Sequence, residues 1–196
     1  MSSKKLTTAA LLTAAALIMF VIEAQIPPLT AVPGIKLGLS NIVTLFALYT
    51  MGPGSALCIL LVRIFLGSIF LGQMMTLIYS LAGGLLCFCL SALMSRVFPP
   101  HKLWVVSVFG AMAHNVGQIA TAIWVTNTPE LLLYLPILII SGIITGMFTG
   151  VTCQTLLRRL IELKSVSYSG KWKTTPYRKN EQQSDYQKQK KLPNEN

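Results

Sequence analysis

The stretch Pro27-Pro-Leu-Thr-Ala-Val-Pro-Gly-Ile-Lys-Leu-Gly-Leu-Ser-Asn-Ile-Val-Thr-Leu45 joins two long apolar segments and differs from both. Its three prolines and two glycines oppose a regular helix, because proline lacks an amide hydrogen and glycine loses more backbone entropy than other residues. Irregular backbone at membrane depth is tolerated only where protein covers it or where it lines a cavity. We therefore expect this stretch to cap or wall a binding site.

The composition is that of a membrane protein with a polar tail. Of the 196 residues, 53% are hydrophobic and 11% are charged, whereas about 25% of residues are charged in soluble domains. Ten of the 16 Lys and Arg residues occur from Arg158 onward. We therefore predict a transmembrane domain over residues 1–160 and a disordered, basic cytoplasmic tail over residues 161–196. The tail is expected to face anionic lipid, and no nucleic acid is expected as a partner.

Uncharged apolar runs predict an all-α fold, a bundle of six transmembrane helices. The first run resembles a signal peptide at its start, but Glu23 and Gln25 interrupt the region in which a cleavage site would lie. The Gly52-Pro-Gly54 turn separates the second span from the third. The predicted spans are residues 6–22, 36–51 (beginning at residue 40 or as early as 35), 55–70, 74–94, 103–125 and 131–157.

The distribution of basic residues predicts the orientation of this bundle, because Lys and Arg near span ends collect on the cytoplasmic side. With six spans, one side carries Lys4, Lys5, Arg96, Lys102, Arg158 and Arg159. The other side carries Glu23, Lys36 and Glu130. Both termini are therefore expected in the cytoplasm.

Arg63 falls near the centre of the third span. A central Arg costs about 2.5–3.5 kcal/mol on insertion scales and usually faces a cavity, a counter-charge or backbone carbonyls. Two partners fit this position: Glu23 at the outer end of the first span, in a pair that fixes packing, or an anionic ligand. Gly67, one turn further on, leaves room beside the guanidinium in either case.

Polar side chains also interrupt the fifth span. His114 and Gln118 share a helix face, and Asn115 is adjacent. They form either hydrogen bonds between helices or part of a ligand site, whereas a single His without a carboxylate does not favour a metal. Convergence of polar groups from several spans favours a site for an anionic or amphipathic small molecule. The predicted substrate-binding residues are Lys36, Asn41, Arg63, His114, Asn115 and Gln118.

Stripes of small residues mark faces for close helix packing. Gly142, Gly146 and Gly150 recur at every fourth position of the sixth span and are predicted to pack against another helix. Ala10 and Ala14 have the same spacing in the first span, where they could instead dock another subunit.

The sequence lacks the motif for binding ATP and the motif for binding magnesium with a prenyl diphosphate. It has no phosphate-binding Gly-x-x-x-x-Gly-Lys-[Ser/Thr] loop, so the chain does not itself use ATP to drive transport. Asp185 is its only aspartate, so it has no aspartate-rich cluster to hold magnesium against a diphosphate. We expect no catalytic residue, metal or cofactor.

Several motifs occur together that resemble one bacterial membrane family, the Gx transporter family, also labelled heptaprenyl diphosphate synthase component I. They are Pro33-Gly-Ile-Lys-Leu-Gly-Leu-Ser-Asn-Ile-Val-Thr-Leu45, Arg63-x3-Gly67, Tyr79-Ser-Leu-Ala-Gly-Gly84, Ala113-His-Asn-Val-Gly-Gln118 and Tyr134-Leu-Pro136 followed by Ser141-Gly142. The resemblance covers residues 6–157 and implies a multi-pass protein of the bacterial inner membrane.

That family is in turn similar to the substrate-binding S components of energy-coupling factor transporters. This resemblance implies a six-helix binding subunit that works with separate coupling and ATPase subunits. It also implies that residues 27–39 cap an outward-facing pocket and that Ala10 and Ala14 contact the coupling subunit. The enzyme label implies a different function, that of a non-catalytic partner of a soluble prenyl diphosphate synthase. A third interpretation is a structural membrane protein whose polar groups pair only with one another.

Overall fold

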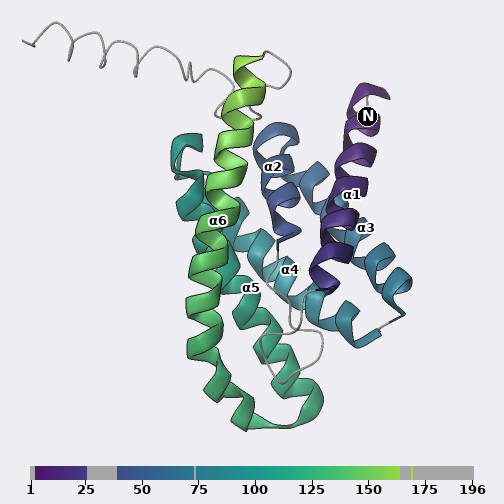
Figure 1. Cartoon of the computed structure of the whole chain (residues 1–196), viewed down its shortest axis with the longest axis vertical. Helices are drawn as coiled ribbons and strands as arrows, with labels where there is room; N and C mark the ends of the chain where they lie inside the picture. The colour runs from purple at the N-terminus through teal and green to yellow at the C-terminus, as the bar shows by residue number, and fades with distance from the viewer. Residues whose placement is uncertain (1–2, 26–38, 73, 164–168, 170–196) are drawn as a thin grey trace, which may run out of the picture.

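The computed structural model describes residues 3–25, 39–72, 74–163 and 169, and every regular element in these ranges is helical (Figure 1). The predicted all-helical fold is therefore confirmed for this part of the chain. The helices are α1 (Ser3–Ala24), α2 (Asn41–Met51), α3 (Pro53–Leu71), α4 (Met74–Met94), α5 (Leu103–Thr126) and α6 (Leu135–Glu162), with short 3₁₀ helices η1 (Pro100–Lys102) and η2 (Pro129–Tyr134).

Five of these helices, α1, α3, α4, α5 and α6, are long and apolar enough to cross a membrane. The chain is therefore a multi-pass membrane protein. By contrast, α2 has 11 residues, or about 17 Å at 1.5 Å per residue, against a hydrocarbon core of about 30 Å. Within the described part of the span predicted over residues 36–51, residues 39 and 40 form a turn and the helix runs from Asn41 to Met51. Residues 26–38, and with them most of the predicted cap, lie outside the described part.

Glycine and proline separate α2 from α3, as the Gly52-Pro-Gly54 signal predicts. Gly52 has a φ of 90°, a value that is costly for residues with a side chain. Pro53 follows at the first position of α3, where its missing N–H breaks no helical hydrogen bond.

Helices α4, α5 and α6 form a closely packed layer with α5 in the middle. Their glycines lie where backbones approach each other. A methyl group added at Gly117 of α5 would lie 2.9 Å from Cα of Gly83 in α4, and one at Gly146 of α6 would lie 2.7 Å from Cα of Val108 in α5. Side chains larger than hydrogen do not fit there without moving the helices.

The first three helices form a second group, in which α3 packs against both α1 and α2. Phe20 of α1 lies against Gly67 of α3, where an added methyl group would be 2.5 Å from the ring. Buried side chains of α2 and α3 then pack against Leu103 and Leu157 of the other layer. Short α2 is thus held between the two groups.

One end of the bundle, which we call the basic end, contains the start of α1, the α2–α3 turn, η1 and the end of α6 (Figure 1). Its exposed cations are Lys5, Arg96, Lys102, Arg158 and Arg159. Ser169 is the one described residue of the predicted tail beyond Leu163. Its amide donates a 2.8 Å hydrogen bond to the carbonyl of Tyr49 near this end.

Candidate functional site

Arg63 of α3 is 2% exposed and is turned toward the first residues of α2. Its Nη1 donates to the Ser40 hydroxyl and its Nη2 donates to Oδ1 of Asn41 at 3.2 Å. The Glu23 carboxylate, itself 4% exposed, interacts electrostatically with the guanidinium. The guanidinium therefore interacts with Glu23 of α1 and with the two polar residues at the start of α2, Ser40 and Asn41.

Ser40 departs from the usual behaviour of its residue type. It is the N-cap of α2, a position where serine normally accepts a hydrogen bond from the first-turn amides, yet its hydroxyl makes no capping bond. The hydroxyl accepts from Arg63 instead. Helix α2 therefore lacks the stabilisation of a side-chain N-cap, and the Ser40 hydroxyl instead links α2 to α3.

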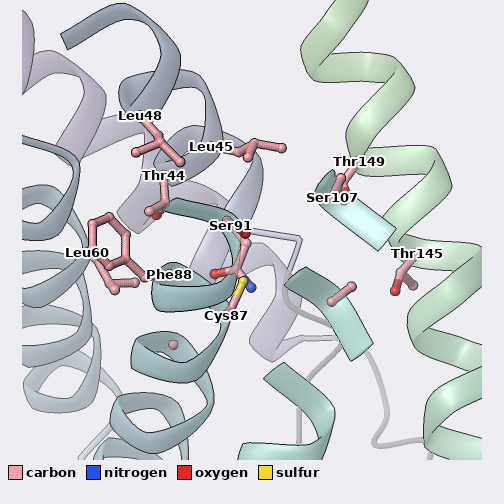
Figure 2. Close-up of a pocket in the computed structure, with 13 residues that line it drawn as sticks. Thr44, Leu45, Leu48, Leu60, Cys87, Phe88, Ser91, Ser107, Thr145 and Thr149 are labelled. Atoms are coloured by element: carbon pink, nitrogen blue, oxygen red, sulfur yellow. Dashed lines mark hydrogen bonds between the residues drawn. The ribbon is translucent and has the colours of Figure 1, made fainter. Parts of the chain in front are cut away.

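A pocket lies beside this network, between α2 and the α4–α6 layer (Figure 2). Its cavity volume is about 20 Å³, which is room for about one ordered water. A larger ligand therefore requires the lining side chains to move. The described lining residues are Asn41, Thr44, Leu45, Leu48, Leu60, Gly84, Cys87, Phe88, Ser91, Ser107, Ala111, Thr145 and Thr149.

Hydroxyl groups line this pocket from four helices, α2, α4, α5 and α6. Figure 2 shows Thr44 of α2 on one side and Thr145 and Thr149 of α6 on the other. Ser107 and Thr149 are joined by a 2.8 Å hydrogen bond between their hydroxyls, and Thr145 donates to the carbonyl of Ser141 at 2.9 Å. Thr44 is 7% exposed, and its hydroxyl has no hydrogen-bond partner among the described residues.

The polar residues of α5 form a separate buried cluster. Asn115 donates a 2.6 Å hydrogen bond to the carbonyl of Leu138, and the His114 imidazole is hydrogen-bonded to the backbone of Gly83. Within the described structure, His114 Nδ1 and both polar side-chain atoms of Gln118 have no partner. Gln118 is 0% exposed. This cluster belongs to the α4–α5–α6 contact and does not line the pocket.

The predicted binding residues are thus distributed over several places. Asn41 lines the pocket, and Arg63 reaches it only through Asn41. Lys36 lies outside the described residues. In the ranges that the structure describes, no three His, Cys, Asp or Glu residues are grouped as a metal site would require.

The residues predicted for helix contacts lie on two different surfaces. Gly142, Gly146 and Gly150 of α6 face α5, where added methyl groups would lie 2.6–2.8 Å from the nearest atoms. Ala10 and Ala14 are exposed on the surface of α1.

Sequence reasoning missed the hydroxyl lining. A signal was present, because small or polar residues recur four positions apart on each wall: Cys87 and Ser91 on α4, Ser107 and Ala111 on α5, and Thr145 and Thr149 on α6. Such pairs share a helix face. Single hydroxyls draw little notice in an apolar helix, since they can bond to their own backbone.

A family model described as heptaprenyl diphosphate synthase component I matches residues 12–156. The chain belongs to the heptaprenyl diphosphate synthase component I family. No curated protein matches the chain. The family match includes the Arg63 network, every described lining residue of the pocket and the polar cluster of α5, so all of these lie in the part that carries the family signal.

Proposed function

We propose that this protein is a membrane-embedded binding subunit that holds a small amphipathic solute for a transporter, in the manner of an S component. The observation that carries the proposal is the pocket, to which five helices contribute side chains within the apolar bundle. A purely structural bundle has no need to enclose hydrogen-bonding groups, because burying them without partners costs free energy. Asn41 lines this pocket, and Arg63 holds the Asn41 side chain by a hydrogen bond to its Oδ1.

The proposed topology has six crossings, with α2 as the intramembrane part of the second, and both termini in the cytoplasm of a bacterial cell. The exposed cations of the basic end support this orientation. The residues of α2 that line the pocket run from Asn41, at the start of the helix, to Leu48, near the α2–α3 turn. On this orientation the pocket lies toward the cytoplasmic half of the bundle, which differs from the outward-facing pocket that the resemblance to S components implies.

The proposed partners are a coupling subunit and an ATPase, since the sequence has no phosphate-binding loop of its own. Ala10 and Ala14 are exposed on α1 and are the proposed contact with the coupling subunit. Small side chains allow another helix to approach closely within a bilayer. The proposal implies that Ala10→Leu abolishes capture of that partner while solute binding survives.

Solute binding tests this function directly. The full chain, purified in detergent and in nanodiscs, would be screened for thermal stabilisation by a broad library of small metabolites. Binding of a hit should be weakened by Ser91→Val, because Ser91 lines the pocket, and should be unaffected by Ser95→Val, because Ser95 lies just beyond the end of α4 and does not line it. Absence of any stabilising compound would contradict a binding role.

A second candidate function is favoured by the family match. In it, the chain is a non-catalytic membrane component that assists a soluble prenyl diphosphate synthase in making long isoprenoid chains. The test is to co-express the chain with such a synthase and to measure the length of the product. An unchanged length, together with failure to co-purify, would remove this candidate.

A further inference from the structure

We propose that the pocket binds an uncharged molecule that offers a hydrogen-bond acceptor such as a carbonyl or hydroxyl oxygen, and that it does not take an anion. The inference rests on the proposed binding function and specifies its ligand class. It also assigns Arg63 a positioning role toward Asn41, in place of direct contact with the ligand.

The pocket offers no counter-ion to an ionic ligand. None of the thirteen described residues that line it is charged at neutral pH. Arg63 contacts the lining residue Asn41, but its guanidinium already donates to Ser40 and Asn41 and interacts with Glu23. An anion placed in the pocket would lose its hydration without gaining a counter-ion, which is strongly unfavourable in an apolar interior.

The Arg63 contact fixes which way the Asn41 amide points. Arginine is only a donor, so the Asn41 atom that faces it at 3.2 Å is the carbonyl oxygen. The amide NH₂ of Asn41 is then the group left for other partners. Because Asn41 lines the pocket, it presents donors to a ligand, and a ligand acceptor is the matching group.

Thr44 supplies the second polar contact. It lies one helical turn from Asn41, on the same wall; the residue is 7% exposed, and its buried hydroxyl has no partner among the described residues. A buried hydroxyl left in this state is destabilising, and a ligand that bonds to it removes the penalty. Apolar side chains complete the walls and call for a partly apolar ligand: Leu45, Leu48, Leu60, Phe88 and Ala111.

The test uses the full chain in nanodiscs and matched compounds that share a skeleton and differ in charge. Suitable pairs are nicotinamide and nicotinate, pantothenol and pantothenate, and geraniol and geranyl diphosphate, added to a broad metabolite library sorted by charge. Thermal stabilisation identifies binders, and equilibrium titration measures their affinity. We expect the stabilising compounds to be uncharged.

Two threonines of α2 provide a matched pair of variants. Thr44→Val should weaken binding of the neutral compounds about tenfold, the loss expected for one hydrogen bond, while the ligand-free melting temperature stays the same or rises. Thr50 donates to the carbonyl of Phe46 at 2.8 Å and does not line the pocket, so Thr50→Val should leave affinity unchanged. A rise in stability with a loss of binding distinguishes a ligand contact from a structural one.

The outcomes separate this inference from the function on which it rests. One possible result is that only anions bind, that Arg63→Gln or Lys36→Met abolishes this binding, and that Thr44→Val retains it. This result would overturn the inference that the ligand is uncharged and would leave the binding role in place. Binding of neutral compounds that Thr44→Val does not weaken would place the site elsewhere and overturn the inference. If no compound of any charge binds, the proposed function fails as well.

Discussion

Nη2 of Arg63 lies 3.2 Å from Oδ1 of Asn41, so the buried cation of α3 holds the first turn of α2. The same guanidinium bonds to Ser40, the N-cap residue that makes no capping bond. Helix α2 is short and would gain little stability from its own backbone hydrogen bonds. Its position therefore depends on a side chain from its neighbour.

Removing this cation should destabilise the fold. Arg63→Met removes the charged donor to Ser40 and Asn41 and the cation that interacts with Glu23, and one hydrogen bond to a charged group contributes about 1.5–3 kcal/mol. Thermal unfolding in a mild detergent measures the effect. Arg96→Met, at an exposed position, serves as control and should change the melting temperature little. The double variant Arg63→Met/Glu23→Gln should recover part of the loss, and failure to recover would show that Glu23 is not coupled to Arg63.

Two glycine substitutions of the same kind should have opposite effects. Gly146→Ala places a methyl group 2.7 Å from Cα of Val108, which should cost about 1–3 kcal/mol by overpacking. Gly54→Ala, in the first turn of α3, meets no atom within 4 Å and should stabilise by up to about 1 kcal/mol through the greater helix propensity of alanine. Unfolding curves of the two variants decide the matter. Equal effects would contradict the close α5–α6 contact.

Neighbouring amides of α5 should also respond with opposite signs. Gln118→Leu removes a buried amide whose two polar atoms have no partner among the described residues, so stability should rise by about 1–3 kcal/mol. Asn115→Leu removes the donor to the Leu138 carbonyl and should lower stability. Melting temperatures report both changes. A loss of stability in Gln118→Leu would indicate that the amide has a partner in the native membrane.

The proposed orientation predicts which positions reagents can reach in intact cells. On a cysteine-free background, Glu130→Cys should react with a membrane-impermeant maleimide applied from outside. His101→Cys should react only after the membrane is permeabilised. Both residues are exposed, so accessibility on the protein is matched. The reverse labelling pattern would place the basic end outside the cell.

The helices could be predicted because their signals are local and strong. Long apolar runs ended by Gly52, Gly72 or Pro99 define the elements to within a few residues. The exception is the second span, where residues 39 and 40 form a turn and the helix begins only at Asn41. An apolar pattern specifies burial, but it does not say whether the backbone is helical.

The site was less predictable because side-chain direction depends on how helices rotate against each other. The sequence indicated that Arg63 and His114 lie at similar depth, but it could not show that Arg63 bonds to Ser40 while His114 is sealed against Gly83. Thr44 and Ser107 cannot be identified as lining residues from the sequence, because a single hydroxyl in an apolar helix is weak evidence for a site. Packing shows their role. The Ser107 hydroxyl is hydrogen-bonded to Thr149, and the Thr44 hydroxyl has no partner in the described structure.

The glycine-to-backbone contacts of α4, α5 and α6 also have a consequence for how such proteins diversify. Where main chains touch, at Gly117 and Gly146, no side chain exists to be exchanged for a slightly different one, so these helices act as an invariant frame. Under the proposed binding function, ligand preference would change through the side chains that line the pocket, among them Asn41 and Thr44 of α2. Relatives with different solutes should share the frame and differ along one face of α2.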